Sequence, residues 1–333
     1  MAKVKTKVKL PTKTDLLKFY KKLPFTFGDL FVYIMLILMA FVFVYPFLHM
    51  VTTSLKSYTD LIDVTVKWIP KSLTLQSYAT AIEVMRLDST LVNSVLVTVL
   101  ATIGHVFSCS FVAYGFARYN FFGKGALFVL VILSMLVPTQ ILIIPLYMTY
   151  TKMAFTIGAT TFKVLGTYLP IVVPCFLGYG LKGGLFIFLY RQYFLGIPKA
   201  LEEAATIDGC GPFKTFFRIA FPSAGATTIV CIVLSMVWHW NDYYEPGIYL
   251  TDWDSMLLPQ ITASLKELVT SMQNQMMGEA ATGSTMTENL DTLFHDGVVM
   301  AGTVISIAPP LIAYLFLQKR FIEGIEHSGL TGM

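Results

Sequence analysis

The chain has 333 residues, of which 55% are hydrophobic and only 13% are charged, and its formal net charge is +4. A soluble globular protein usually has about 25% charged residues, and the apolar residues here form long blocks rather than short periodic segments. This composition excludes an ordinary soluble domain and predicts an all-α, polytopic bundle of transmembrane helices.

The N-terminal segment, residues 1–29, is basic. Lysines recur from Lys3 to Lys22, and Asp15 is the only acidic residue among them. Such a segment is typical either of a tail that binds nucleic acid or of a cytoplasmic segment beside a membrane. An apolar block follows at once, which favours the membrane interpretation and no nucleic-acid partner.

Six blocks without lysine, arginine, aspartate or glutamate are long enough to cross a membrane. A bilayer core about 30 Å thick needs a helix of about 20 apolar residues. The first block starts too late and is too long for a cleaved signal peptide. The predicted spans are residues 30–50, 91–117, 125–151, 164–181, 219–241 and 297–318.

Basic residues indicate the orientation, because cytoplasmic loops are enriched in lysine and arginine. With six spans, both termini, the tail 319–333 and most basic loops lie on the cytoplasmic side. Between residues 252 and 296 the only lysine or arginine is Lys266. The exterior segments are then 52–90 and 242–296, and the polar stretch 271–291 is either an irregular loop or a loop that contacts a partner. The basic residues on the cytoplasmic side are Arg118, Lys124, Lys182, Arg191, Lys199, Lys214, Arg218, Lys319 and Arg320.

Cysteines and histidines show no pattern of metal ligands or of catalysis. No two cysteines form a C-x-x-C pair, so buried free thiols are expected, and the histidines lack metal-ligand spacing, so no metal site is predicted. There is no His-Glu-x-x-His motif, and we predict no catalytic residues and no enzyme activity. The residues concerned are Cys109, Cys175, Cys210, Cys231, His49, His105, His239, His295 and His327.

The segment 197–222, between the fourth and fifth predicted spans, is expected to form a helix-turn-helix elbow on the cytoplasmic side. Pro198 suits the first turn of a helix, and Gly209 is placed to end that helix with a positive φ. Pro212 opens a second short helix, and Pro222 lies at the entry to the fifth span. Small residues on one side of the elbow would let a partner protein approach closely.

The elbow also carries a spaced pattern: Glu-Ala-Ala, three residues, Gly, nine residues, Ile, one residue, Leu, Pro. The pattern resembles the loop of permease subunits in ABC importers, whereas an ordinary amphipathic connection would have no reason to keep this spacing. The chain departs from it once, with Phe221 in the place of leucine. The matching residues are Glu203, Ala204, Ala205, Gly209, Ile219 and Pro222.

Further short matches resemble the smaller, maltose-type permease of the carbohydrate uptake family. The resemblance runs from about Phe31 to Gly332. It includes Arg191-Gln192-Tyr193-Phe194-x-x-Ile197-Pro198, Trp240-Asn241-Asp242 and Gly324-Ile325-x-x-Ser328-Gly329.

The resemblance implies a type I ABC importer-like permease fold in a bacterial cytoplasmic (inner) membrane. The elbow would dock on a cytoplasmic ATPase, with Glu203 making a charge-assisted contact or locking the elbow itself and Gly209 holding the turn. The chain has no Gly-x-x-x-x-Gly-Lys-Ser/Thr loop. It should therefore bind no cofactor, while ATP and Mg²⁺ sit on the partner ATPase.

The implied assembly contains a second homologous permease, two ATPases and an extracellular solute-binding protein, which would contact segment 242–296. The expected cargo is a sugar or oligosaccharide. A permease for a non-sugar solute, and a secondary carrier that needs no ATPase, remain alternatives.

An aromatic and polar cluster at the end of the fifth predicted span is a candidate for the solute path. Sugars are bound by aromatic faces and by polar side chains at their hydroxyl groups, and the cluster offers both. An interfacial belt of aromatic residues is the other interpretation. The cluster consists of Trp238, Trp240, Asn241, Tyr243 and Tyr244.

Three polar residues in or near predicted spans, Asn93, His105 and Gln140, either line the path or bond neighbouring helices. No lysine, arginine, aspartate or glutamate lies deep within a predicted span, which disfavours proton-coupled transport.

Overall fold

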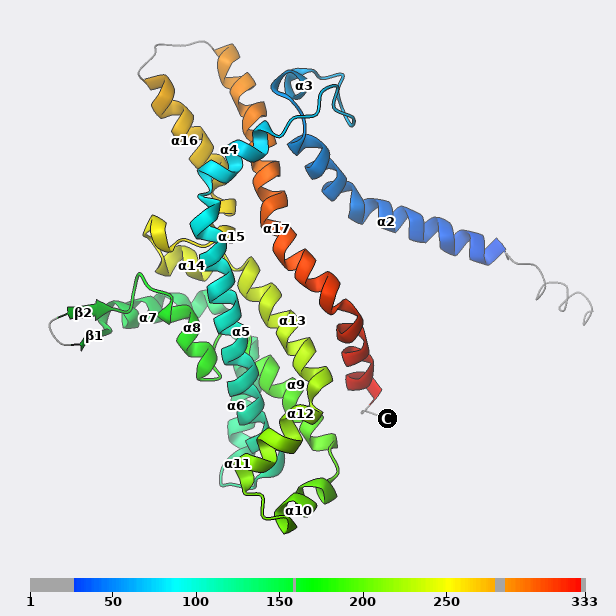
Figure 1. Ribbon diagram of the computed structural model, residues 1–333, viewed down its shortest axis with the longest axis vertical. Coiled ribbons are helices and arrows are strands. Elements are labelled where there is room, and N and C mark those ends of the chain that lie inside the picture. Colours follow the sequence, from blue (N-terminus) through cyan, green and yellow to red (C-terminus); the bar gives the residue numbers. More distant parts are fainter. Residues whose placement is uncertain (1–26, 158–159, 279–284, 331–333) are drawn as a thin grey trace, which may run out of the picture.

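The computed structural model describes residues 27–157, 160–278 and 285–330. Most of the basic N-terminal segment, part of the polar exterior stretch and the last three residues therefore lie outside the described residues. The described chain is an elongated bundle of helices with one small hairpin (Figure 1). Its helices are α2 (Phe27–Ser54), α3 (Tyr58–Ile62), α4 (Gln76–Val84), α5 (Leu87–Arg118), α6 (Lys124–Leu136), α7 (Thr139–Lys152), α8 (Leu169–Phe176), α9 (Gly183–Gly196), α10 (Lys199–Ile207), α11 (Pro212–Thr215), the π-helix η1 (Phe216–Ala220), α12 (Phe221–Ser223), α13 (Gly225–Asn241), α14 (Tyr244–Tyr249), the 3-10 turn η2 (Trp253–Ser255), α15 (Leu258–Ala263), α16 (Leu265–Gly278) and α17 (Thr285–Leu330), and its strands are β1 (Ala154–Ile157) and β2 (Thr160–Lys163).

Three described helices are long and apolar enough to cross a membrane alone: α2, α5 and the part of α17 from Asp296 to Gly324. Two bent helix pairs raise this number to five if each pair is one span. Helices α6 and α7 meet at 101°, where Pro138 disfavours a helical conformation of the residue before it. The six-span count stays a prediction.

The fourth predicted span is not one helix. Helix α8 has only 8 residues, and Gly178, with φ +73°, follows its end. The chain then returns towards the elbow as α9, whose Phe186, Tyr190 and Phe194 are buried at a helical spacing. Residues 183–196 therefore belong to the bundle, although the sequence placed them in a cytoplasmic segment.

Helix α5 is the centre of the bundle and packs against α8, α9 and α13, while α13 also packs against α17. At the elbow end, the core contains large aromatic side chains, among them Tyr114, Tyr190 and Phe194. At the opposite end, Met85 and Leu265 belong to a second, mainly aliphatic core that also contains Trp240. Close packing of this kind is the main attraction between helices in lipid.

Helix α2 diverges from the bundle (Figure 1). Its apolar stretch is exposed on all sides, and its buried residues are Met50, Thr53 and Ser54 near its C-terminal end. It contacts α17. A helix so apolar and so exposed within one chain needs lipid or another protein around it.

The segments predicted to be exterior are more regular than the sequence indicates. Helices α3, α4 and α16 gather at the end of the molecule opposite α10 and α11 (Figure 1). The predicted irregular stretch 271–291 is helical up to Gly278 and again from Thr285, because it contains methionine, glutamine and glutamate, which favour helices. The antiparallel pair β1–β2 is an addition to the all-α prediction, and its paired residues include Phe155 with Phe162.

Candidate functional site

The first elbow helix, α10, ends at a glycine that the backbone requires. Gly209 has φ +74°, and its N–H donates to the carbonyl of Thr206 at 3.0 Å. The next N–H, of Cys210, donates to the carbonyl of Ala205 at 2.8 Å, which completes a double C-terminal cap. A Cβ added at Gly209 would meet nothing within 4 Å. The positive φ alone therefore explains the glycine.

The elbow is fastened to the end of α5 by Arg118. Its Nε lies 2.8 Å from Oε1 of Glu202, in an ion pair whose side chains are 7% and 19% exposed. Its Nη2 donates to the carbonyl of Ile197 at 2.6 Å. From the sequence, Arg118 indicated only the orientation, and this contact was not predicted. The adjacent acidic residues Glu202 and Glu203 could have suggested a partner for the arginine at the end of the second predicted span.

Glu203 differs from its neighbour Glu202 because its side chain is exposed. Among the residues that the structure describes, Glu203 forms no ion pair. Glu203 was expected either to contact the ATPase or to hold the elbow in place. In this arrangement Glu202 holds the elbow in place through Arg118. Glu203 is left free to contact a partner.

The other residues of the spaced pattern are divided between the surface and the interior. Ala204 and Pro222 are exposed, Ala205 is buried and Ile219 is half-buried. Ile219 belongs to the π-helix η1, a form that is often found at functional positions. Between α12 and α13 the chain bends by 78°, so Pro222 lies before the bend rather than at the start of the long helix.

Phe216 connects the elbow to the bundle core. Its side chain is 1% exposed. Its ring centroid lies 5.2 Å from that of Tyr114 and 6.3 Å from that of Phe194. Because these rings belong to α5 and α9, a displacement of the elbow would move the core helices with it.

The elbow carries several exposed apolar side chains. Ile207 is the extreme case at 87% exposure. Exposed apolar residues are common where a protein contacts a partner. These residues, called the elbow patch below, are Leu201, Ile207, Phe213 and Phe217.

The five residues of the predicted solute path do not form one surface. Trp240 is buried, and its Nε1 donates to the carbonyl of Ser306 in α17 at 2.9 Å. Trp238 packs near Phe186, with ring centroids 5.6 Å apart. In this arrangement Trp240 therefore packs helices together. The remaining members are exposed: Asn241, Tyr243 and Tyr244.

The other polar residues near predicted spans also differ in their surroundings. Asn93 donates to the carbonyls of Asp254 at 2.9 Å and Met256 at 3.3 Å, so it bonds α5 to the segment after α14. Gln140 is exposed, and His105 is fully buried.

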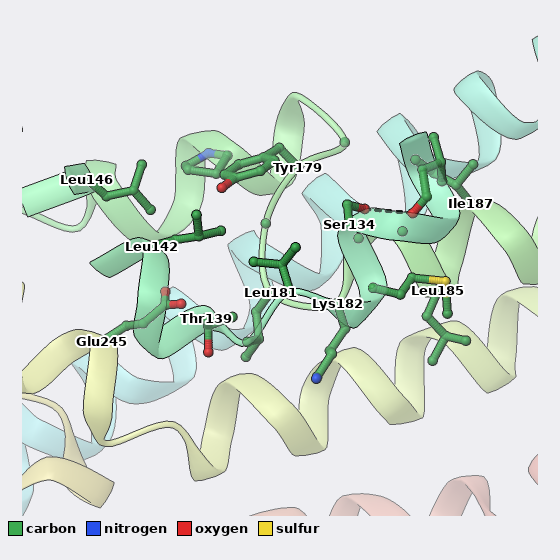
Figure 2. A pocket seen from close by; sticks show the side chains of 18 of the residues that line it. Ser134, Thr139, Leu142, Leu146, Tyr179, Leu181, Lys182, Leu185, Ile187 and Glu245 are labelled. Atoms are coloured by element: carbon green, nitrogen blue, oxygen red, sulfur yellow. Dashed lines mark hydrogen bonds between the residues drawn. The ribbon is translucent and has the colours of Figure 1, made fainter. Parts of the chain in front are cut away.

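A pocket of about 600 Å³ lies among α6, α7, α8 and α9. Figure 2 shows leucine side chains together with Tyr179, Lys182 and Glu245 around it. The hydroxyl of Ser134 already donates to the carbonyl of Val131 at 2.7 Å. Trp238 is the one member of the predicted path that lines this pocket. The lining is mainly apolar, and it also contains the aromatic rings of Tyr150, Tyr179 and Tyr249 and the charged Lys182 and Glu245.

The expectation of no metal site rested on spacing along the chain. Folding nevertheless brings together His105, Cys175 and His239 from three different helices, with one possible ligand atom from each within 4.8 Å of the others. Sequence spacing cannot reveal a cluster of this kind.

Comparison with known proteins gives the family. The profile of the family described as "Binding-protein-dependent transport system inner membrane component" matches residues 107–326. The arabinooligosaccharides transport system permease protein AraQ of Halalkalibacterium halodurans is 28% identical over 88% of this chain and 93% of its own length. AraQ of Bacillus subtilis is 30% identical over 72% of each chain. The polygalacturonan/rhamnogalacturonan transport system permease protein YtcP of Bacillus subtilis is 27% identical over 91% of this chain and 98% of its own.

A solved structure shows the same fold. It is a bacterial ABC transporter involved in the import of the acidic polysaccharide alginate, and the match has a TM-score of 0.65 and 18% identity, covering 94% of this chain and all of that chain. The profile match covers well over half of the sequence, and the helices agree with a multi-pass protein. The chain therefore belongs to the family of inner-membrane components of binding-protein-dependent transport systems, the permease subunits of ABC importers.

Proposed function

We propose that this permease forms half of a translocation path for an oligosaccharide and is driven by a separate ATPase that docks on the elbow. The observation that supports the coupling role is that two adjacent glutamates of α10 have different surroundings. Glu202 fastens the elbow to α5 through Arg118, while Glu203 and the elbow patch stay exposed.

The pattern residues would have distinct parts in this docking. Glu203 and Ala204 contact the ATPase, with the carboxylate offering a charge-assisted bond and the small residue allowing close approach. Ala205 and Gly209 keep the shape of α10. The half-buried Ile219 and the exposed Pro222 belong to the segment that carries motion into α13.

The proposed assembly contains a second permease, two ATPases that bind ATP and Mg²⁺, and an extracellular solute-binding protein. The family description names a binding-protein-dependent system. The sequence itself lacks the phosphate-binding loop of an ATPase. The wide exposure of α2 also agrees with a neighbouring subunit in the membrane.

An oligosaccharide is the proposed cargo because the printed names of similar permeases mention arabinooligosaccharides, starch degradation products and polygalacturonan. The exterior helices α4, α16 and the first part of α17 are the proposed contact of the binding protein.

The coupling proposal is tested by producing the full-length chain with a second permease and an ATPase of the same transport family and purifying it in detergent. The wild type and Glu323→Ala, a control at an exposed acidic residue of α17, should retain the ATPase. Glu203→Ala should lose it or lose hydrolysis stimulated by the binding protein. If the intact chain retains no ATPase, the elbow is only a connection and a secondary carrier becomes the better interpretation.

The cargo is tested separately with the reconstituted complex. Arabino-oligosaccharides or pectic oligosaccharides, added with the binding protein, should raise the rate of ATP hydrolysis, and peptides should not. Stimulation by peptides alone would refute the cargo and leave the coupling role intact.

A further inference from the structure

Three side chains that could bind a metal meet in the interior of the bundle. They are His105 of α5, Cys175 of α8 and His239 of α13, and they are 0%, 0% and 5% exposed. The Nε2 of His239 lies 3.4 Å from Nδ1 of His105 and 3.6 Å from the sulfur of Cys175. One ligand atom from each residue can be chosen so that all three lie within 4.8 Å of one another.

The separation of His239 Nε2 and the sulfur of Cys175 matches that between two ligands of one metal ion. Metal–nitrogen bonds of about 2.0–2.1 Å and metal–sulfur bonds of about 2.3 Å, at trigonal or tetrahedral angles, place neighbouring ligand atoms about 3.3–3.8 Å apart. The 3.6 Å between Nε2 of His239 and the sulfur of Cys175 falls in this range. The 3.4 Å between Nε2 of His239 and Nδ1 of His105 is long for a hydrogen bond between two ring nitrogens.

His105 also has an unused nitrogen. Its Nδ1 lies 3.1 Å from the hydroxyl oxygen of Ser235, and within the described part of the chain its buried Nε2 has no hydrogen-bond partner. If Nδ1–H donates to Ser235, the lone pair of Nε2 is left without a proton donor. A histidine that binds a metal through one nitrogen usually donates the other N–H to a neighbour in this way.

Gly180 keeps space beside two of the possible ligands. A Cβ at this position would lie 2.5 Å from the sulfur of Cys175 and 2.7 Å from Nε2 of His105. Gly180 is not among the glycines with a positive φ, so its backbone conformation does not require glycine. The position requires glycine because a Cβ would clash with Cys175 and His105.

We propose that His105, Cys175 and His239 bind one cuprous ion. Cys175 loses its S–H proton to solvent on binding, and two neutral imidazoles and one thiolate surround Cu⁺ without net charge. The same ligands around Zn²⁺ would leave a positive charge in the interior of the bundle, where an uncompensated charge is strongly disfavoured. Thiolate and imidazole also suit cuprous copper as ligands.

The ion would join three helices that otherwise touch through side-chain packing and a few hydrogen bonds, such as that from Ser108 of α5 to the carbonyl of Cys175 at 2.6 Å. Arg118 at the C-terminal end of α5 binds Glu202 of the elbow. Helix α13 follows the elbow in the chain. Bound copper would therefore stabilise this arrangement of α5, α8 and α13 against heat.

The first test is a titration of the complete purified complex with Cu⁺ under anaerobic conditions, in competition with a cuprous chelator. We expect one tightly bound ion per chain, with a copper–sulfur bond in X-ray absorption. Cys175→Ser should weaken binding at least tenfold. Cys231→Ser makes the same change at a different buried cysteine, which lies in α13. This variant should bind Cu⁺ as tightly as the wild type does.

The second test measures the unfolding temperature, and it uses His239→Gln as well in case Cys175→Ser does not fold. One equivalent of Cu⁺ should raise the unfolding temperature of the wild type and of Cys231→Ser, but not that of His239→Gln. The proposal is overturned if the wild type binds no more copper than Cys175→Ser. Retention of Zn²⁺ in preference to Cu⁺ also overturns it, because the charge argument then fails.

Discussion

Two adjacent carboxylates of α10 have different surroundings and therefore different consequences when changed. Glu202 is mostly covered and bound to Arg118, which in turn donates to the carbonyl of Ile197. Glu203 is exposed to solvent. The first residue contributes to the stability of the permease itself, and the second contributes to its contact with another protein.

Glu202→Gln should destabilise the purified permease by about 1–3 kcal/mol, because the ion pair is lost and the buried Nε of Arg118 is left without a charge partner. Glu203→Gln should change stability by less than about 0.5 kcal/mol, as is usual for exposed positions. Thermal unfolding in detergent measures both. Equal losses in the two variants would contradict the separation of roles.

Gly209→Val should weaken the end of α10 by about 1–2 kcal/mol, the cost of a left-handed conformation for a residue with a Cβ. Hydrogen exchange of residues 199–210 should rise, and coupled ATP hydrolysis should fall. Gly211→Ala is the matched control, since Gly211 has φ −73° and open space around it. Gly209→Asn should recover part of the loss, because asparagine tolerates this conformation.

In the predicted exterior segment 52–90, Lys71 and Asp63 are paired at 2.6 Å. The pKa of Asp63 is held well below its ordinary value, first by the hydrogen bond from Lys71 and then by hydrogen bonds from Thr65. A carboxyl with a lowered folded-state pKa adds stability above its unfolded pKa, and that stability is lost as the pH falls through the folded pKa.

The titration of Asp63, followed by NMR with labelled aspartate, should therefore have a midpoint below the ordinary value of about 3.9. Lys71→Met should move this midpoint upwards. An unchanged midpoint would show that the pair does not form in solution.

At the scale of elements, glycines set how closely helices approach. A Cβ at Gly324 of α17 would lie 2.8 Å from the carbonyl oxygen of Ala226, a backbone atom of α13 that cannot move aside easily. A Cβ at Gly115 of α5 would meet nothing within 4 Å.

Gly324→Ala should consequently lower stability by about 1–3 kcal/mol through overpacking. Gly115→Ala should be neutral or slightly stabilising, because alanine is the better helix former. The comparison requires only unfolding temperatures of the two purified variants. A neutral Gly324→Ala would mean that α17 lies farther from α13 than described.

The long helices could be predicted from the sequence, because α2 and α5 are uninterrupted apolar blocks. The spaced pattern of the elbow likewise placed Glu203 and Gly209 on one short helix and its turn. The bend between α6 and α7 and the return through α8 and α9 could not be read from apolar content, since both halves of each pair are apolar. Arg118 and Glu202 are distant in the sequence, and no periodicity connects them.

At the scale of the whole molecule, the number of crossings decides where the termini lie. The described helices allow three crossings, or five with the bent pairs, whereas termini on one side need an even number. In Figure 1 the C-terminal part of α17 runs towards the elbow end of the bundle. This direction agrees with a cytoplasmic C-terminus, because the elbow is proposed to meet an ATPase there.

Reporter proteins that are active only in the cytoplasm, fused to either end, should both be active. This result requires α8 and α9 to make the fourth crossing together. Activity at one terminus alone would show an odd number of crossings and would remove the six-span prediction. A fusion within the exterior helix α4 serves as the inactive control.

Helix α5 has 32 residues without a break, and it is bound by charge at both ends: Arg86 to Asp254 at 3.5 Å, and Arg118 to Glu202 at 2.8 Å. At a rise of about 1.5 Å per residue it is a rod about 48 Å long. A tilt of this rod by about 5° would displace one end relative to the other by about 4 Å. A sideways step at the elbow can thus reach the opposite end of the bundle through one continuous helix.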